Sequence, residues 1–527
     1  MIDIKALTLE QKILQTKVAR IEKGKKLTDK PGAVFFFGEI ITEPDDAGLD
    51  ELRGYVEEVY ADADIPPLIT SDFENGCGSM VKGLTQLPYL MGLGAANDAQ
   101  LAYDYGKVTA LEAKSIGANW SFSPVADLNI NRRNPLVNVR AMTDDAGLAV
   151  RLLPQVVRGM QENGLAACAK HFPGDGLDYR DQHIVPTQNT LAFEDWKRLS
   201  GRVFKELIDS GVDSIMAGHI SLPSYQKERD DEFGMAYPAT LSRELITDLL
   251  KGELGFQGVV VTDALDMGGF NCWYDSKERA EIEAFRAGCD MMLWPTSQYA
   301  ENMKKAIESG YISMERLDDA ISRILALKEK LGLFCGSYER CKPLTAEEKA
   351  FVKETQRKVS AKAVTLLRDR QKLLPIDTSK VKTVLLVPVV NHEPAVAVAE
   401  HLREALENRG LKVIYKMQMQ TADFYRLAGE ADVILYAMFS RPFRPIGFLD
   451  YYETEAAKLQ VSLNVERRKT ICVSFGSPYF FEQYFERAET FVNAYSMLNT
   501  AVDAFVSAAF GEQHFYNFSP VKLSEKL

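Results

Sequence analysis

The sequence lacks the features of a membrane-spanning or exported protein. No apolar stretch is long enough to cross a bilayer, and the opening Met-Ile-Asp-Ile-Lys-Ala-Leu-Thr-Leu-Glu has neither the apolar core nor the cleavage site of a signal peptide. The seven cysteines are scattered without a Cys-x-x-Cys pair, which is typical of free thiols in a reducing compartment. We therefore expect a cytoplasmic protein without a membrane partner.

An excess of positive charge is also missing. The chain has 62 lysines and arginines against 74 aspartates and glutamates, and its formal net charge of −12 argues against nucleic acid as a partner. In the second half of the chain no Gly-x-Gly-x-x-Gly follows an apolar run, which argues against a nucleotide site. The histidines show no His-x-x-x-His spacing and no cysteine neighbours them, so a zinc site is not indicated. We expect no metal ion and no cofactor.

What is present is an alternation of short apolar runs and helical segments in a chain of 527 residues, which is too long for one ordinary core. After an amphipathic helix predicted at 9–21, seven apolar runs are bounded by Gly, Pro, Asp or Asn and followed by segments of helical period. This alternation predicts a parallel sheet covered by helices, and over this length a closed (β/α)8 barrel. The seven predicted strands are 33–37, 67–70, 118–122, 166–169, 213–217, 258–262 and 290–294.

A second α/β unit is predicted after the barrel. We assign residues 1–345 to the barrel domain, 346–380 to a linker helix and connection, and 381–527 to a C-terminal domain. The C-terminal runs alternate with helices predicted at 396–408 and 454–465, which indicates a doubly wound α/β/α sandwich. Its predicted strands are 381–390, 412–415, 432–438, 470–475 and 491–495.

Ionisable residues follow five of the predicted barrel strands. In a barrel these positions lie on the carboxyl rim, where active sites are assembled. Solvated loop charges would explain one or two such positions but not five strands in succession. The residues are Asp72 and Glu74, Asp127, Lys170 and His171, His219, and Asp263.

Asp263 stands at the end of the run Val-Val-Val-Thr-Asp. A carboxylate fixed at a strand end suits covalent catalysis or metal binding. The alternative is an aspartate that caps the next helix, a role for which Asp266 is the better candidate.

The segment 170–183 reads Lys-His-Phe-Pro-Gly-Asp-Gly-Leu-Asp-Tyr-Arg-Asp-Gln-His. Its proline and glycines predict a tight, mobile turn that brings side chains to a substrate. Asp181 and His183 are two residues apart, so on extended chain they share one face, and the carboxylate would make the imidazole a proton donor suited to neutral pH. The alternative is two solvated loop residues. Lys170 and His171 suit the binding of polar substrate groups, whereas His219 suits either a substrate contact or a core position.

These motifs resemble glycoside hydrolase family 3, in particular its β-N-acetylglucosaminidase branch and two-domain form. Residues 170–183 are similar to the Lys-His-Phe-Pro-Gly-x-Gly-x-x-x-x-Asp-x-His signature of that branch, and 261–267 to the segment with the family's nucleophile. Residues 120–127 with 134–140, 323–334 and 363–375 extend the resemblance over nearly the whole chain.

The resemblance implies a retaining double displacement. Asp263 would be the nucleophile, and His183, oriented by Asp181, would be the acid/base. Substrate-binding roles would fall to Asp72, Arg140, Lys170 and His171.

Three positions depart from the family pattern. Phe73-Glu74-Asn75-Gly76-Cys77 stands where the family usually has Gln-Glu-Gly-Gly-Arg, so the lip of the pocket has lost an arginine. Gln182 replaces a small hydroxyl residue, and Asp175 adds a carboxylate to the glycine turn. No catalytic group is lost by these changes.

The expected function is hydrolysis of terminal β-linked N-acetylglucosamine in cell-wall or chitin-type oligosaccharides, with a small oligosaccharide or glycoside as the partner and the oligomeric state left open. A β-glucosidase or mixed specificity is the first alternative, because the lip is altered. Phosphorolysis is the second, because a neutral histidine does not repel an incoming phosphate. A carbohydrate-binding protein without activity is the third, although all three catalytic candidates are present.

Overall fold

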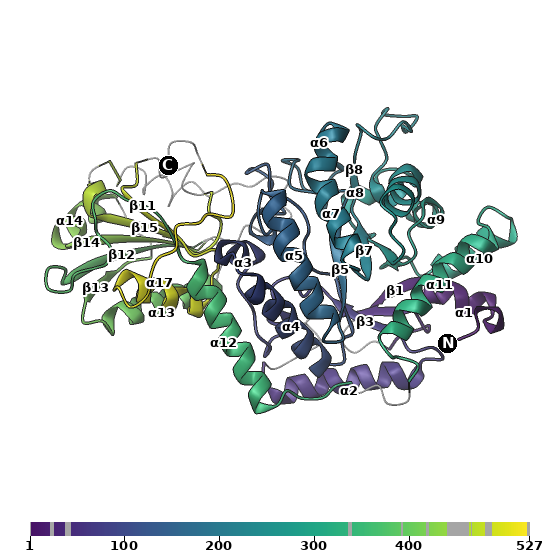
Figure 1. Cartoon of the computed structure of the whole chain (residues 1–527), viewed down its shortest axis with the longest axis horizontal. Helices are drawn as coiled ribbons and strands as arrows, with labels where there is room; N and C mark the ends of the chain where they lie inside the picture. The colour runs from purple at the N-terminus through teal and green to yellow at the C-terminus, as the bar shows by residue number, and fades with distance from the viewer. Residues whose placement is uncertain are drawn as a thin grey trace.

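The structure is a computed structural model that describes residues 2–21, 26–36, 44–335, 340–390, 394–417, 421–439, 463–464, 466–479 and 487–523. Two separate sheets organise this part of the chain, with a barrel in the first two thirds and a second sheet beside it (Figure 1). The long helix α12 (Ala346–Ala363) connects them. Among the described helices, none combines the length and apolar character needed to traverse a bilayer.

The predicted barrel is confirmed. Eight parallel strands among the described residues pair in the order β10-β1-β2-β3-β4-β5-β7-β9, and a parallel bridge between Val261 and Met291 brings the two ends of the sheet together. The strands are β1 (Lys17–Arg20), β2 (Ala33–Phe35), β3 (Leu68–Ser71), β4 (Trp120–Ser121), β5 (Ala166–Phe172), β7 (Ser214–Ala217), β9 (Val259–Thr262) and β10 (Met292–Leu293). A two-stranded sheet of β6 (Thr187–Gln188) and β8 (Ile220–Ser221) is separate from this barrel.

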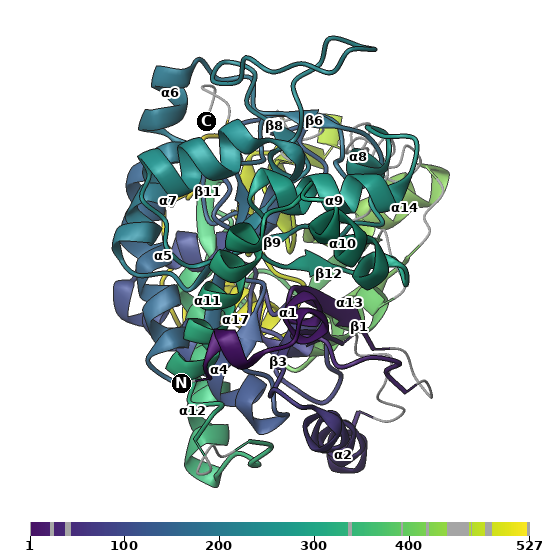
Figure 2. The ribbon, with the colours of Figure 1, turned by 90° about the vertical axis from the view of Figure 1, so that its right-hand side faces the viewer.

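Helices surround the barrel. Figure 2 shows the molecule with the barrel toward the viewer. They are α1 (Leu9–Gln15), α2 (Asp46–Asp62), α3 (Leu90–Ala96), α4 (Ala99–Ser115), α5 (Ala146–Gln161), α6 (Phe193–Arg198), α7 (Ser200–Asp209), the π-helical η6 (Glu244–Glu253), α8 (Gly268–Asn271), α9 (Lys277–Ala287), α10 (Tyr299–Glu308) and α11 (Met314–Lys330). Short 3-10 helices are η1 (Ile4–Ala6), η3 (Cys77–Ser79), η4 (Asn138–Arg140) and η5 (Ala239–Leu241).

The predicted opening helix 9–21 is wrong in its second half. Helix α1 begins with a Thr8 capping box and ends at Gln15, and the following residues form β1, which pairs with β2 and β10. Gly32 approaches the helix end so closely that a Cβ there would lie 2.0 Å from the Gln15 carbonyl oxygen. The chain therefore turns into the barrel where its apolar spacing alone still fits a helix, and β1 supplies the eighth strand.

Aromatic side chains contribute to the barrel core. Trp120 and Phe122 meet edge to face with ring centroids 4.7 Å apart, and Phe122 stacks on Phe35 at 5.7 Å. The Trp120 indole N–H donates to the Ser214 hydroxyl at 2.8 Å, so this buried polar group is satisfied. A filled core of this kind leaves the carboxyl rim as the place where a cavity can form.

The predicted doubly wound sheet is also confirmed. The strands β12 (Thr383–Val390), β13 (Lys412–Tyr415), β14 (Val433–Phe439), β15 (Thr470–Ser474) and β16 (Thr490–Asn493) are parallel, and the order is β11-β16-β15-β14-β12-β13. Neighbouring residues of one strand face opposite clusters: Leu386 packs with α13 (Pro394–Glu407) and α17 (Asn499–Ala509), and Leu385 packs with α14 (Thr421–Glu430). Both faces of the sheet are therefore covered.

The start of the second unit contains a strand that was not predicted. The predicted linker 346–380 contains α12 and also β11 (Thr365–Asp369), which pairs antiparallel with β16 at the edge of the second sheet. Most of the helix predicted at 454–465 lies outside the described residues. The domain limits at 345 and 380 stay predictions.

The second sheet is anchored to the barrel by a small buried cluster and by hydrogen bonds. Met91 of α3 packs with Tyr479 and Tyr495, and the Tyr479 hydroxyl accepts a hydrogen bond from the Asn129 amide at 2.8 Å. Close by, the Ser496 hydroxyl accepts from the Tyr89 N–H at 3.0 Å. These contacts hold the segments after β15 and β16 beside the barrel.

Candidate active site

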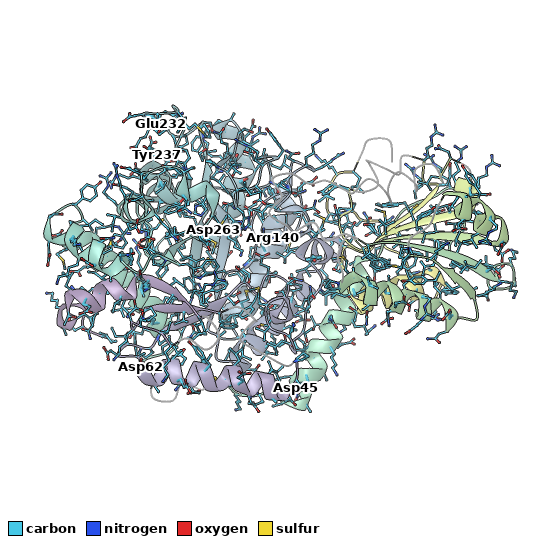
Figure 3. The ribbon with its side chains drawn as sticks, turned by 180° about the vertical axis from the view of Figure 1, so that it is seen from behind. Asp45, Asp62, Arg140, Glu232, Tyr237 and Asp263 are labelled. Atoms are coloured by element: carbon cyan, nitrogen blue, oxygen red, sulfur yellow. The ribbon has the colours of Figure 1, made fainter. Side chains whose placement is uncertain are left out.

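A cavity of about 490 Å³ lies at the carboxyl rim of the barrel, a size that suits a small ligand. Asp72 follows β3, Lys170 and His171 lie near the end of β5, Asp263 follows β9, and Trp294 follows β10. Figure 3 shows Asp263 within the barrel and Arg140 on the side that faces the second sheet. The second sheet completes the wall with Pro394, Ala395, Val398, Ser496, Met497 and Leu498.

Asp263 is fixed by the strand that precedes it. Its N–H donates to the Ala217 carbonyl at 2.8 Å, which continues the pairing of β9 with β7, and its Oδ1 accepts from the Ala264 N–H at 2.8 Å. Its Oδ2 lies 3.9 Å from His171 Nε2. Burial alone would raise the pKa of Asp263, but the nearby histidines and Lys170 lower it, so the group is ionised near neutral pH.

The alternative role of Asp263 as a helix cap is not what the structure shows. Helix α8 begins at Gly268, and Met267 occupies its N-terminal cap position without a side-chain hydrogen bond. Asp266, predicted as the better cap, instead lines the cavity.

Asp181 and His183 form a hydrogen-bonded dyad. The Asp181 Oδ1 lies 2.7 Å from His183 Nδ1 and also accepts the backbone N–H of His183 at 2.9 Å. Burial alone would lower the pKa of His183, but Asp181 and then Asp263 raise it above its ordinary value. Asp181 is fully buried, whereas the His183 side chain is 31% exposed and reaches the cavity. The imidazole is therefore a proton donor that stays charged at higher pH than a free histidine.

The two side chains meet through a turn and not, as predicted, along extended chain. The N–H groups of Ile184 and Val185 donate to the Asp181 carbonyl at 3.0 and 3.1 Å, which closes the turn. An aspartate at the start of a turn commonly accepts a hydrogen bond from the backbone N–H two residues later. Here the same carboxylate is also hydrogen-bonded to the imidazole of His183.

The segment after the nucleophile candidate touches the dyad directly. The N–H of Gly268 donates to the His183 carbonyl at 2.8 Å, and that of Gly269 donates to the Gln182 carbonyl at 3.0 Å. A Cβ at Gly268 would lie 2.1 Å from the Ile184 carbonyl oxygen, so this approach requires glycine. The structure therefore packs the turn predicted as mobile against residues 268–269, with acid/base and nucleophile candidates on one cavity.

An ion-pair network forms another part of the cavity. Lys170 Nζ lies 2.6 Å from Asp72 Oδ1 and 2.7 Å from Glu74 Oε1. Arg140 donates to both Glu74 carboxylate oxygens, at 2.7 and 2.8 Å. Burial alone would lower the pKa of Lys170 and raise that of Glu74, but the opposite charges reverse both shifts. Lys170, Arg140 and Glu74 thus remain charged at the cavity wall, where charged groups make strong hydrogen bonds.

Asp127 holds His171 in one orientation. Its Oδ2 lies 2.7 Å from His171 Nδ1, and its Oδ1 accepts the His171 N–H at 3.0 Å. The other ring nitrogen therefore faces the cavity and Asp263. Lys170 and His171 lie within β5 and not after it, so the strand is three residues longer than predicted.

Glu74 and Asp127 are the site residues to which the sequence assigned no role. Both were recognised as acids at strand ends, but their partners Arg140 and His171 are 66 and 44 residues away in the chain. Their position after barrel strands was the only sign in the sequence that they belong to the site. The pairing itself depends on the closed barrel.

His219 occupies a core position. Its Nδ1 lies 3.0 Å from the Thr240 hydroxyl, its Nε2 lies 2.9 Å from the Ala264 carbonyl, and burial lowers its pKa. As a neutral side chain it supports the segment after Asp263 and does not line the cavity. Within the described residues, no three His, Cys, Asp or Glu side chains are placed to hold a metal ion.

Known proteins resemble this chain in sequence and in fold. Residues 6–327 match the family model described as glycosyl hydrolase family 3 N terminal domain. A beta-N-acetylglucosaminidase/beta-glucosidase from Cellulomonas fimi is 32% identical over 498 residues, covering 88% of this chain and 85% of the relative.

Two solved structures resemble the whole architecture. A glycoside hydrolase family 3 beta-N-acetylglucosaminidase from Paenibacillus sp. str. FPU-7 has a TM-score of 0.84 and 29% identity, covering 98% of this chain and 99% of that one. A beta-glucoside phosphorylase has a TM-score of 0.88 and 26% identity, covering 98% and 94%.

The ion-pair network predicts that Glu74 is important for stability. Glu74→Ala leaves Lys170 and Arg140 without a shared partner, and breaking such a pair costs about 3 kcal/mol of unfolding free energy. The matched control is Glu301→Ala, which removes an exposed pair with Lys305 and should change the unfolding free energy far less. Denaturant titration measures both variants. Equal losses would contradict the importance of the network.

Proposed function

The chain belongs to glycosyl hydrolase family 3, and we propose that it is a retaining exo-β-glycosidase that removes terminal β-linked N-acetylglucosamine from cell-wall or chitin-type oligosaccharides. The observation that carries this proposal is the presence of Asp263 and the His183–Asp181 dyad at one cavity. A cavity of this size, closed by charged side chains, suits a single terminal sugar. The names of the relatives from Cellulomonas fimi and Paenibacillus support the choice of sugar.

The first chemical step forms a covalent glycosyl-enzyme. A carboxylate oxygen of Asp263 attacks the anomeric carbon, and the bond from that carbon to the leaving oxygen breaks. His183 gives its proton to the leaving oxygen, and Asp181 stabilises the imidazolium before the transfer. In the second step the neutral His183 takes a proton from water, the water oxygen attacks the same carbon, and the ester to Asp263 breaks.

Sugar hydroxyls would be bound by the ion-pair network and by His171. Lys170 has three N–H donors and gives two of them to Asp72 and Glu74, which leaves one for a hydroxyl. Asp72, with a side chain 35% exposed, can accept from a hydroxyl at the same edge, and Arg140 lines the cavity beside it. Charge-assisted bonds of this kind fix a sugar ring in one orientation.

Phosphorolysis is the second candidate function. The observation in its favour is that the acid/base is an imidazole: once it has given up its proton it is neutral and does not repel a phosphate dianion as a carboxylate would. One similar solved structure is named a beta-glucoside phosphorylase. A β-glucosidase or mixed activity is the third candidate, in line with the double name of the Cellulomonas fimi relative.

A carbohydrate-binding protein without activity fits the site least well, because Asp263, Asp181 and His183 are all present and in position. For the cellular location we propose the cytoplasm. The seven cysteines, all free thiols, support a reducing compartment.

A direct assay tests the proposed function. We expect a higher kcat/KM for nitrophenyl β-N-acetylglucosaminide than for nitrophenyl β-glucoside. We also expect free sugar as the product in phosphate buffer. A clear preference for the glucoside would overturn the choice of sugar, and formation of sugar 1-phosphate would establish phosphorolysis in place of hydrolysis.

The two reacting groups give different variant phenotypes. Asp263→Ala should reduce turnover to background with every substrate, because no covalent intermediate can form. His183→Ala should lower kcat/KM about 10²- to 10⁴-fold for alkyl glycosides but far less for activated leaving groups, which need no proton. Mass spectrometry after a slow fluorosugar should find an ester on Asp263. An unmodified Asp263 after demonstrated inactivation would refute the assignment.

The hydrogen bond between Asp181 and His183 leads to a prediction for how kcat/KM depends on pH. The acid form of His183 is needed for the first step, so kcat/KM for an unactivated disaccharide falls as the pH rises through the pKa of His183, which lies above its ordinary value. Asp181→Asn removes the carboxylate that raises this pKa. The alkaline limb of the pH profile should therefore move to lower pH. A limb that stays in place would show that His183 is not the acid.

A further inference from the structure

Gln182 lies between the two dyad residues, but its side chain points into the protein. It is fully buried and is not among the residues that line the cavity. Its Oε1 accepts the N–H of His219 at 2.9 Å, its Nε2 donates to Asp175 Oδ2 at 3.3 Å, and its carbonyl accepts from Gly269. One residue therefore ties the dyad loop, residues 173–187, to two other parts of the barrel rim.

Asp175 connects the same loop to the sugar-binding side of the cavity. It is only 3% exposed. Its Oδ1 accepts from the Asn134 amide at 2.9 Å and from the Gly176 N–H at 2.6 Å. Its own N–H donates to Asp127 Oδ1 at 2.7 Å, and Asp127 is the residue that orients His171. The hydrogen bond between Asp175 and Gln182 thus joins the support of His171 to that of His183.

We propose that Gln182 and Asp175 are positioning residues that fix the acid/base His183 relative to the nucleophile Asp263. The inference rests on the proposed function, and it adds two residues whose side chains hydrogen-bond to neighbours of the reacting groups. The physical reason is that the hydrogen bonds of Gln182 hold the backbone between Asp181 and His183 to the barrel rim. The side chain of Gln182 and the backbone bonds to Gly268 and Gly269 attach residues 181–183 to the rim.

The size of the effect follows from the geometry of proton transfer. A general acid acts only within hydrogen-bonding distance of the atom that it protonates. Displacement of a catalytic group by about 1 Å costs about 100-fold in rate. If the loop keeps its fold but loses the hydrogen bond between Gln182 and Asp175, the step that suffers most is the protonation of the leaving oxygen.

The test compares Gln182→Ala with a matched control. Gln226 is also a buried glutamine that braces a loop, through Leu222 N–H at 2.8 Å and the Tyr237 carbonyl at 2.7 Å, but that loop carries no residue of the dyad or the nucleophile segment. We expect Gln182→Ala to lower kcat/KM about 100-fold for an alkyl β-glycoside and less than about threefold for a dinitrophenyl glycoside. Gln226→Ala should affect both substrates equally, whatever its effect on stability.

Asp175 is tested by the same readout. Asp175→Ala should show the same dependence on the leaving group. The double variant should lose less than the product of the two single losses, because both changes remove one shared hydrogen bond. Gln182→Met keeps much of the side-chain volume but loses both side-chain hydrogen bonds, so it should show the same dependence on the leaving group and covers the case in which Gln182→Ala does not fold.

Equal losses for the two leaving groups in Gln182→Ala, or no loss, would overturn the proposal. Hydrogen exchange gives a readout that is independent of activity: the amides of Gly268 and Gly269 should exchange faster in Gln182→Ala than in Gln226→Ala, and unchanged exchange would also overturn it. A wild-type protein that cleaves no glycoside would instead refute the proposed function. The exchange result would still show whether Gln182 holds the segment of Gly268 and Gly269 in place.

Discussion

Mutual neutralisation of buried charge is the constraint on which this site depends. Four carboxylates, those of Asp72, Glu74, Asp127 and Asp263, are gathered at one rim. Glu74 and Asp263 stay ionised there because Lys170, Arg140 and the histidines lie among them, since an isolated buried carboxylate would take up a proton instead. These groups come from β5 and from the segments that follow β3, β4 and β9, so the closed sheet is what brings the opposite charges together.

The same balance separates the roles of two histidines that look alike in the sequence. His183 bonds a buried carboxylate at the cavity, which favours its charged form. His219 bonds a hydroxyl and a carbonyl in the core, and burial favours its neutral form. The identity of the partner atom, and not the residue type, decides which imidazole can give a proton.

Much of the architecture was predictable because it follows from local patterns. Apolar runs bounded by turn residues located seven barrel strands, and the spacing of Asp181 and His183 indicated their pairing. Strand β1 was missed because Lys17 to Arg20 continue the apolar spacing of α1, and only contact with β2 and β10 makes them a strand. The bonds of Glu74 to Arg140 and of Gln182 to Asp175 were missed for a related reason: buried polar partners are set by the closed fold and leave no periodic signal.

The wall that the second sheet adds to the cavity has a consequence for how such a protein can change. Pro394, Ala395 and Val398 of α13, with Met497 and Leu498, border the opening, while every group assigned to bond cleavage comes from the barrel. Substitutions on this wall can alter which molecules fit without disturbing the charges that drive the reaction. The second unit can thus change the shape of the cavity while the barrel keeps its charged groups, and each part can evolve while the other is kept.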